Sequence, residues 1–245
     1  MADKYTSRSN PKIKFLAQIA RKPMPECFLV EGFHMVQMAA EEGALTEVFA
    51  LEDPHIQGVK TSLVTREIID KVCVSKNPEP ICGLCSLKRN DEPLGERILV
   101  LDHLQDPGNV GTLLRTAVAF GFDDVWLLPN TCSPFNPKSL ASSQGAIFKV
   151  RLHTAKYDDL EKLHGQGYAI LGTALRDSVP MEDYPVPEKL ALVLGNEGKG
   201  MTEEAIKKCD TMLKISIRSM ESLNVAAAGA IFLHKFCLIK TKIGA

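Results

Sequence analysis

The stretch LALVLGNEGKGM, residues 190–201, joins an uninterrupted apolar run to a turn that contains three glycines. Such a run is typical of a strand in a parallel sheet, where helices cover both faces. Glycine lets the backbone adopt dihedral angles that a side chain forbids, and it lets a ligand approach the main chain closely. The stretch therefore predicts an α/β domain with a ligand site at the end of this strand.

A dinucleotide site is one candidate for this turn, but the glycine spacing disfavours it. The order here is G-x-x-G-x-G, whereas the dinucleotide fingerprint is G-x-G-x-x-G at the start of a βαβ unit with a distal acidic residue. The turn also lies too late in the chain for such a unit to follow. A nicotinamide-dependent oxidoreductase is thus a weak alternative, which a failure to bind nicotinamide cofactors would exclude.

Further apolar runs alternate with helical segments on both sides of this strand. They cover residues 98–104, 123–129, 168–175 and 212–217. Together they predict one doubly wound parallel sheet. The polar stretch KRNDEPLGE, residues 88–96, predicts a connection to a separate N-terminal domain. We therefore expect domains at residues 1–90 and 96–245.

The N-terminal region predicts a small α/β unit. Ser9 or Asn10 can cap a helix that accepts Pro11 in its first turn. Strands are expected at residues 28–32, 46–51 and 81–87, and helices at residues 34–43 and 65–72.

The beginning of this unit is basic, although the whole chain has a formal net charge of −1. Six cationic side chains occur up to Lys22, against the single acid Asp3. A solvated helix face is the simpler explanation of such a cluster. Contact with RNA phosphates is the alternative, and it would use Lys12, Lys14, Arg21 and Lys22.

The composition excludes several classes of protein. Hydrophobic residues make up 45% of the chain and charged residues 24%, as in ordinary globular proteins. No segment reaches the roughly 20 apolar residues of a membrane helix, and the first residues lack the apolar core of a signal peptide. Cys82 and Cys85 would point to opposite faces of the expected strand, so they do not predict a metal site. We expect a cytoplasmic protein with reduced cysteines and without a metal ion.

A second turn follows the expected strand at residues 98–104, in the segment LDHLQDPGNVGTLLRTAVAFG, residues 101–121. Asp106, Pro107 and Gly108 turn the chain, and Asn109 can cap a helix that follows. Arg115 is the one charged residue of that helix, so it needs a partner. A carboxylate in a structural salt bridge and a substrate phosphate are equally good candidates.

A third turn lies in ISIRSMESLNVAAAGA, residues 215–230, where Ser222, Leu223 and Asn224 precede the last helix. Helix capping alone explains either Ser222 or Asn224. All three turns, however, lie just beyond the C-terminal ends of apolar strands, where open α/β sheets bind their ligands. We therefore expect the three turns to meet at one site.

At these residues the chain resembles the SpoU/TrmH class of the SPOUT methyltransferase superfamily. DPGNVGTLLRTAVAFG is similar to the first motif of that class, LVLGNEGKGM to the second, and ISI with SLNVAAA to the third, in the same order. SNPKIKFL, RKP and FLVEG resemble the small, ribosomal-protein-like α/β domain that binds the RNA substrate in many members.

The resemblance implies an enzyme that methylates a ribose 2′-hydroxyl in RNA with S-adenosylmethionine as methyl donor. Ribosomal RNA is the expected substrate, and tRNA is the alternative. The resemblance also implies a trefoil knot in the C-terminal parallel-sheet domain, a topology that is exceptional among proteins. A homodimer through the C-terminal helix is implied as well, and NVAAAGAIFLHKFCLIKTK is apolar nearly all round as a helix.

The resemblance assigns roles to individual residues. The implied cofactor-binding residues are Thr173, Leu194, Gly195, Asn196, Gly198, Ile215, Ile217, Leu223 and Asn224. The implied catalytic residues are Asn109, Arg115, Glu197, Ser222 and Asn224.

The expected chemistry depends mainly on alignment. The methyl group of a sulfonium is already activated, whereas a ribose hydroxyl is a poor nucleophile until it loses its proton. Arginine hardly ever loses a proton, so we favour phosphate binding by Arg115 over a role as base. Glu197 is expected to fix Arg115 or another donor. An inactive RNA-binding protein of the same fold is the remaining alternative, and the joint presence of these polar residues disfavours it.

Overall fold

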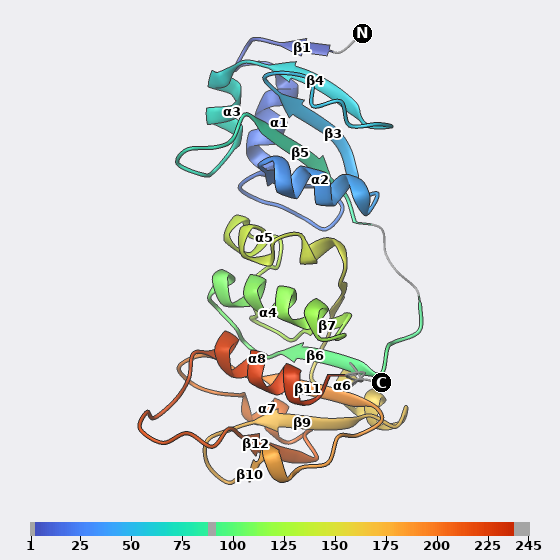
Figure 1. Cartoon of the computed structure of the whole chain (residues 1–245), viewed down its shortest axis with the longest axis vertical. Coiled ribbons are helices and arrows are strands. Elements are labelled where there is room, and N and C mark those ends of the chain that lie inside the picture. The colour runs from blue at the N-terminus through green and yellow to red at the C-terminus, as the bar shows by residue number, and fades with distance from the viewer. Residues whose placement is uncertain (1–2, 88–91, 238–245) are drawn as a thin grey trace, which may run out of the picture. The chain divides into compact units, whose positions relative to one another are not determined.

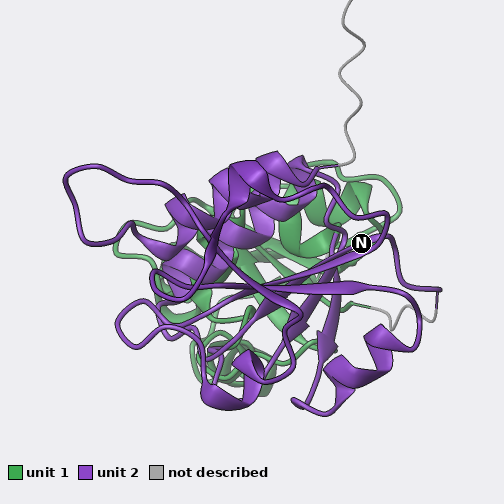
Figure 2. Ribbon diagram, turned by 90° about the horizontal axis from the view of Figure 1, so that it is seen from below, with its two compact units in different colours: residues 1–90, 133–149 green, residues 91–132, 150–245 purple. Residues whose placement is uncertain are grey.

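The computed structural model describes residues 3–87 and 92–237, and the chain forms two compact units (Figure 2). Unit 1 contains residues 1–90 and 133–149, and unit 2 contains residues 91–132 and 150–245. The sequence analysis expected two continuous domains with a boundary near residues 90–96. In the structure, residues 133–149 also belong to unit 1. Residues 88–91 of the expected connection and residues 238–242 of the last apolar segment lie outside the described residues.

Unit 2 is built on one parallel sheet, which has seven strands within the described residues (Figure 1). Their order is β10-β12-β9-β11-β6-β7-β8, and every adjacent pair is parallel. The strands are β6 (Arg97–Leu101), β7 (Asp124–Leu127), β8 (Arg151–Thr154), β9 (Ala169–Thr173), β10 (Val179–Pro180), β11 (Leu190–Leu194) and β12 (Thr211–Lys214). The helices are α4 (Pro107–Ala119), α6 (Asp159–His164), α7 (Glu203–Ile206), α8 (Val225–Lys235) and the 3-10 helix η2 (Met181–Asp183).

The parallel α/β sheet expected from the apolar runs is confirmed, because β6, β7, β9, β11 and β12 lie where the runs predict them. The sequence did not predict β8 and β10. Both are edge strands, so neither needs an uninterrupted apolar run. Residues 215–217, expected to continue a strand, form an irregular turn.

Helices α4 and α8 pack closely, and a glycine makes this approach possible. A Cβ atom at Gly229 of α8 would lie 2.4 Å from Cδ2 of Leu113 and 2.8 Å from Cδ1 of Leu194. Leu113 belongs to α4 and Leu194 to β11, so α8 rests directly on both elements. The last helix of the described chain is thereby fixed beside the helix that follows β6.

Asp106, rather than Asn109, caps α4. The Asp106 side chain accepts a hydrogen bond of 2.8 Å from the backbone N–H of Gly108, and Pro107 occupies the first helical position. The prediction that Asn109 is the cap was therefore wrong, because the Asp-Pro pair begins the helix earlier. The Asn109 side chain is free for contacts outside the helix.

Unit 1 contains a mixed sheet with the order β1-β4-β3-β5-β2 within the described residues. Strand β5 is antiparallel to β2 and β3, while β4 is parallel to β1 and β3. The strands are β1 (Asp3–Tyr5), β2 (Phe28–Glu31), β3 (Leu45–Ala50), β4 (Lys60–Val64) and β5 (Ile81–Cys85). The helices are α1 (Pro11–Ile19), α2 (Phe33–Glu41), α3 (Arg66–Val72), α5 (Pro137–Ser143) and the 3-10 helix η1 (Ala146–Phe148).

Helix α1 follows the sequence prediction. The Asn10 side chain accepts a hydrogen bond of 2.8 Å from the backbone N–H of Lys12 and so caps the helix. Ile13, Leu16 and Ile19 are buried on its inner face. None of the helices within residues 3–87 and 92–237 is long and apolar enough to cross a membrane.

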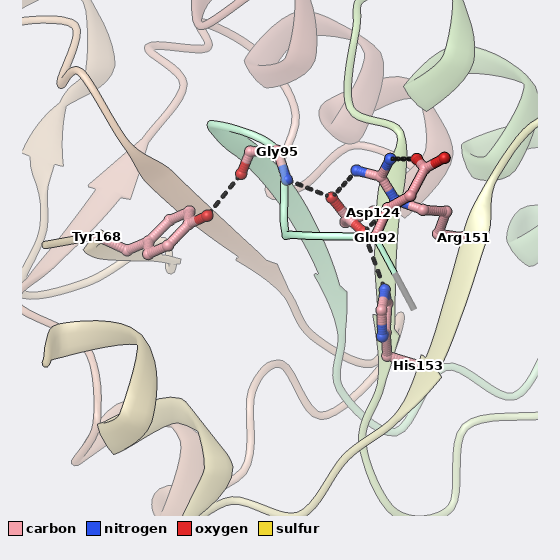
Figure 3. Close-up of polar contacts among 6 residues, drawn as sticks. All are labelled: Glu92, Gly95, Asp124, Arg151, His153 and Tyr168. Carbon is pink, nitrogen blue, oxygen red and sulfur yellow. Dashed lines mark hydrogen bonds and ion pairs between the residues drawn. The ribbon is translucent and has the colours of Figure 1, made fainter. Parts of the chain in front are cut away.

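A polar cluster lies where β7 and β8 begin, at the end of the parallel sheet opposite the three turns. Figure 3 shows the side chains of this cluster. Asp124, the first residue of β7, is fully buried. Its carboxylate accepts hydrogen bonds of 2.5 and 2.8 Å from the Arg151 guanidinium and of 2.7 Å from the Gly95 N–H. His153 Nε2 lies 2.9 Å from the same carboxylate. The cluster therefore ties the chain before β6 to β7 and β8.

The pKa of Asp124 is held well below its ordinary value. Burial alone raises this pKa, but hydrogen bonds from Arg151, His153 and Gly95 to the carboxylate outweigh burial. A carboxyl group whose pKa is lower in the folded state contributes stability above its unfolded pKa, near 3.9. This contribution is lost as the pH falls through the folded-state pKa.

We predict that Asp124→Asn lowers the free energy of unfolding by about 3 kcal/mol near pH 7, because it leaves the Arg151 charge without its buried partner. Urea denaturation measures this change. The difference from the wild type should shrink as the pH falls below about 4. Asp123→Asn is the matched control, because Asp123 is exposed and adjacent. Equal stability of the two variants would contradict the assignment.

Candidate active site

Three turns at the C-terminal ends of parallel strands form the candidate site. Turn 1 (residues 102–109) follows β6, turn 2 (residues 195–201) follows β11, and turn 3 (residues 215–224) follows β12. Hydrogen bonds connect turn 2 to turn 1 and turn 1 to turn 3. The structure therefore brings together the three segments that the sequence analysis selected.

Turn 2 folds back on itself immediately after β11. The backbone groups of Asn196 and Gly200 exchange hydrogen bonds of 2.9 and 3.0 Å. A Cβ atom at Gly195 would lie 2.3 Å from the backbone nitrogen of Met201, so only glycine fits there. Gly200 has φ of +74°, the left-handed region that favours glycine. The glycine spacing thus produces a tight, closed turn.

The side chain of Asn196 holds turn 2 together and attaches it to turn 1. Its oxygen accepts hydrogen bonds of 3.0 Å from the N–H groups of Gly198 and Lys199. Its Nδ2 donates a hydrogen bond of 2.8 Å to the carbonyl oxygen of His103. His103 has φ of +59°, which is uncommon for a residue with a side chain. Asn196 therefore has a positioning role in this geometry.

Asp102 gives turns 1 and 2 a second connection, which the sequence analysis missed. This residue is fully buried at the end of β6. One of its oxygens accepts hydrogen bonds of 2.7 and 3.0 Å from the N–H and hydroxyl of Thr202, and the other accepts one of 3.2 Å from the Tyr157 hydroxyl. An acid that directly follows a buried apolar strand is a signal that could have identified it.

A chain of polar side chains links one residue from each turn. Asn109 Nδ2 donates a hydrogen bond of 3.0 Å to Glu197 Oε1, and Asn224 Nδ2 donates one of 3.1 Å to Asn109 Oδ1. The Asn224 oxygen meanwhile caps α8 by accepting from the N–H groups of Ala226 and Ala227. Asn224 therefore serves both as a helix cap and as part of the polar chain. Glu197 was expected to fix either Arg115 or another donor, and in the structure it accepts a hydrogen bond from Asn109.

Arg115 is exposed on α4. Among residues 3–87 and 92–237 its guanidinium makes no salt bridge and no hydrogen bond. Of the two explanations weighed from the sequence, the buried structural salt bridge is therefore wrong. An exposed guanidinium without an internal partner is available to an external anion.

A cavity of about 640 Å³ opens between turn 2, turn 3 and the end of β9. Several residues selected from the sequence line it: Thr173, Gly195, Asn196, Glu197, Gly198, Ile215, Ile217, Ser222 and Leu223. The lining does not include Asn109, Arg115, Leu194 or Asn224. Leu194 is instead a buried strand residue of the core. Thr173 already donates its N–H to the Met201 sulfur and its hydroxyl to the Val193 carbonyl oxygen.

Other lining residues were missed by the sequence analysis. Arg176, Lys199 and Lys214 bring three cationic side chains to the cavity, and Met201 and Phe232 contribute apolar surface. Arg176 follows the end of β9 and Lys214 ends β12. Their position at strand ends was a usable signal, whereas Phe232 on α8 gives no such signal. The described residues hold no group of three or more His, Cys, Asp or Glu side chains suited to a metal ion.

Apart from Arg115, which belongs to unit 2, the cationic residues selected for RNA contact lie in unit 1, and they differ in their surroundings. Lys14, Arg21 and Lys22 are exposed. The Lys12 ammonium instead lies 2.5 Å from the buried carboxylate of Glu47. Lys12 is therefore engaged within the fold, and the solvated cations are the other three.

Comparisons with known proteins agree with the motif order. The model of the SpoU rRNA Methylase family matches residues 96–234. RlmP of Bacillus subtilis, a 23S rRNA (guanosine(2553)-2′-O)-methyltransferase, is 32% identical over 241 residues, which cover 93% of this chain and 96% of that protein. The chain belongs to the SpoU rRNA Methylase family.

Solved structures show the same fold along nearly the whole chain. A TrmH-family structure from Porphyromonas gingivalis has a TM-score of 0.83 and 30% identity, and the match covers 94% of this chain and 98% of that chain. An AdoMet-bound rRNA methyltransferase from Sinorhizobium meliloti has a TM-score of 0.85 and 24% identity, with coverage of 96% and 97%. The α/β fold with its parallel sheet is thus that of SPOUT methyltransferase structures.

We predict that Gly195→Ala weakens binding of S-adenosylmethionine at least ~10-fold, because the added methyl group forces turn 2 open. Isothermal titration calorimetry measures the affinity. Gly165→Ala is the matched control, since Gly165 does not line the cavity, has φ of −60°, and the nearest atom to an added Cβ there is the Lys162 carbonyl oxygen, 3.5 Å away. An equal effect of both substitutions would show that the closed turn is not required.

Proposed function

We propose that this chain transfers a methyl group from S-adenosylmethionine to a ribose 2′-hydroxyl of RNA, with ribosomal RNA as the substrate. One observation carries the proposal: the polar chain of Asn109, Glu197 and Asn224 joins three turns at a cavity of about 640 Å³. The relative from Bacillus subtilis, which matches almost end to end, is named as a 2′-O-methyltransferase of 23S rRNA.

The cavity fits S-adenosylmethionine in size and chemistry. Its volume lies within the usual range for small-molecule sites. Apolar side chains, among them Ile215, Ile217 and Leu223, suit the adenine ring, and Arg176 or Lys214 suits the carboxylate of the methionine part. Residues 215–223 lie outside regular secondary structure, so their backbone groups are not committed to a strand ladder. The bound cofactor would supply an activated methyl group.

The residues of the chain would act mainly by alignment. Asn109 and Asn224 would orient the ribose, with Glu197 holding the Asn109 amide, and Ser222 would offer a hydroxyl at the cavity wall. Arg115 would bind a phosphate of the RNA, because its guanidinium is exposed and stays protonated. The five residues named from the sequence as catalytic would thus have four kinds of role. Two amides position the ribose, a carboxylate holds one of these amides, a hydroxyl lies at the cavity wall, and a guanidinium binds an anion.

We propose further that unit 2 contains a trefoil knot. The strand order supports this topology, because β12 lies beyond β9, while the next helix, α8, packs on α4 beside β6. The chain must therefore return past β9 and β11 through turn 3. A knotted turn 3 would account for the position of the cavity between turn 2 and turn 3.

A homodimer through α8 is part of the proposal. Ile231 on α8 is 38% exposed, and Leu223, just before this helix, is also 38% exposed. Exposed apolar side chains on a helix that is apolar nearly all round suit an interface between two copies. Such a dimer would let each subunit present groups to the site of the other. Sedimentation equilibrium of the full chain tests the assembly.

Unit 1 would bind the RNA substrate. Its exposed cations Lys14, Arg21 and Lys22 support this role, whereas the charge of Lys12 is paired with Glu47 within the fold. Mapping of ribose methylation across total RNA, from cells with and without this gene, tests the proposed reaction and identifies the nucleotide. A lost mark in tRNA would transfer the assignment to tRNA. No lost mark and no S-adenosylmethionine binding would favour an RNA-binding protein without catalysis.

We predict that Arg115→Ala lowers methyl transfer to RNA by at least ~100-fold, because loss of the phosphate anchor misplaces the ribose relative to the methyl group. Binding of S-adenosylmethionine should change less than about two-fold, because Arg115 does not line the cavity. Single-turnover transfer of a labelled methyl group measures the first quantity and calorimetry the second. Arg115→Lys should recover part of the rate, since it keeps the charge without the planar fork. A rate that is unchanged in Arg115→Ala would remove this residue from the site.

A further inference from the structure

The exposed side of α1 and the turn after it carry a compact group of side chains, here called the α1 patch: Lys14, Phe15, Gln18, Arg21 and Lys22. Lys14 and Phe15 precede Gln18 by four and three residues, so they are its neighbours on the helix surface. The backbone N–H groups of Arg21 and Lys22 donate hydrogen bonds of 3.1 and 2.9 Å to the Gln18 carbonyl oxygen, which keeps the turn after α1 close to Gln18. Ile13, Leu16 and Ile19 of the same helix fill the core. The patch is therefore a surface feature separate from the packing of unit 1.

The charges of the α1 patch are not neutralised within the described chain. Lys14 and Lys22 form no ion pair among residues 3–87 and 92–237. Arg21 gives one Nη1 hydrogen bond of 2.6 Å to the Ala17 carbonyl oxygen, which leaves its charge without a carboxylate. No acidic residue occurs in the sequence from position 4 to position 25. The patch thus presents uncompensated positive charge, which complements phosphate.

Phe15 gives this basic surface an aromatic face. Its side chain is 43% exposed, although buried positions on the same helix are occupied by aliphatic residues. Aromatic side chains among cations are the combination with which proteins hold single-stranded nucleic acid, because bases stack on the ring while the cations follow the backbone. In an A-form duplex the bases are already stacked inside, so a ring on the protein surface has no base face to meet.

We propose that the α1 patch holds an unpaired segment of the RNA substrate, with one base stacked on Phe15 and the flanking phosphates at Lys14 and Lys22. Gln18, whose side-chain amide has both a donor and an acceptor, lies where it can meet an edge of that base. This inference rests on the proposed function, because it specifies the form of RNA that unit 1 recognises. Phe15 is a binding residue in this account and takes no part in methyl transfer.

The test compares Phe15→Ala with Phe33→Ala in the full chain. Phe33 is 51% exposed on the same unit, but its backbone N–H lies 3.1 Å from the carboxylate of Glu79, so its surroundings are acidic. Fluorescence anisotropy measures binding of a single-stranded RNA of about 12 nucleotides and of the same RNA annealed to its complement. Phe15→Ala should weaken single-strand binding on the order of 10- to 100-fold, and Phe33→Ala less than about two-fold. Phe15→Trp should retain binding.

Charge and stacking can be separated by salt. Lys14→Ala with Lys22→Ala should reduce the slope of log affinity against log salt by about 0.7 for each lysine, whereas Phe15→Ala should leave the slope unchanged. Equal effects of Phe15→Ala and Phe33→Ala would overturn the inference, as would equal losses on single-stranded and duplex RNA. If the wild type methylates RNA while Phe15→Ala binds normally, this inference alone fails. If the wild type neither binds S-adenosylmethionine nor methylates RNA, the proposed function fails.

Discussion

The hydrogen bond between Asn224 and Asn109 joins two positions that are 115 residues apart in the chain. It holds the start of α8 against the first turn of α4, and Gly229 allows the two helices to approach closely. This bond and the packing of α8 on α4 together position turn 3 beside turn 2. The cavity between those turns therefore depends on the return of the chain from β12 to α4.

Small residues and amides make this arrangement possible for a physical reason. Turns that meet at a sheet edge expose backbone groups, and each group needs a partner or a ligand. Asn196 and Asn224 supply donor and acceptor together, so each satisfies its own turn and a neighbouring turn. Gly195 permits the contact with Met201 that any side chain would block. Hydrogen bonds thus connect the turns at the rim of the site, and the cavity lining combines apolar side chains with the cations Arg176, Lys199 and Lys214.

The sequence predicted the parallel sheet and the meeting of the three turns, because apolar runs and glycine spacing are local signals. It could not predict pairings that depend on tertiary structure. Asp106 displaced Asn109 as the cap of α4, and Glu47 neutralised Lys12. Phe232 was missed because its cavity position arises only when α8 packs against the sheet. Asp102 was missed although its place directly after a buried apolar strand is a local signal. The sequence could not decide between a structural carboxylate and an external phosphate as the partner of Arg115. Its exposure in the structure favours the external anion.

The central claim is that turn 2, turn 3 and the end of β9 form one binding site for S-adenosylmethionine. Hydrogen–deuterium exchange with and without this ligand tests it most directly, because amide protection reports each segment separately. The account predicts slower exchange in residues 173–176, 195–201 and 215–225 together. Protection confined to one of these segments, or none at saturating ligand, would contradict it.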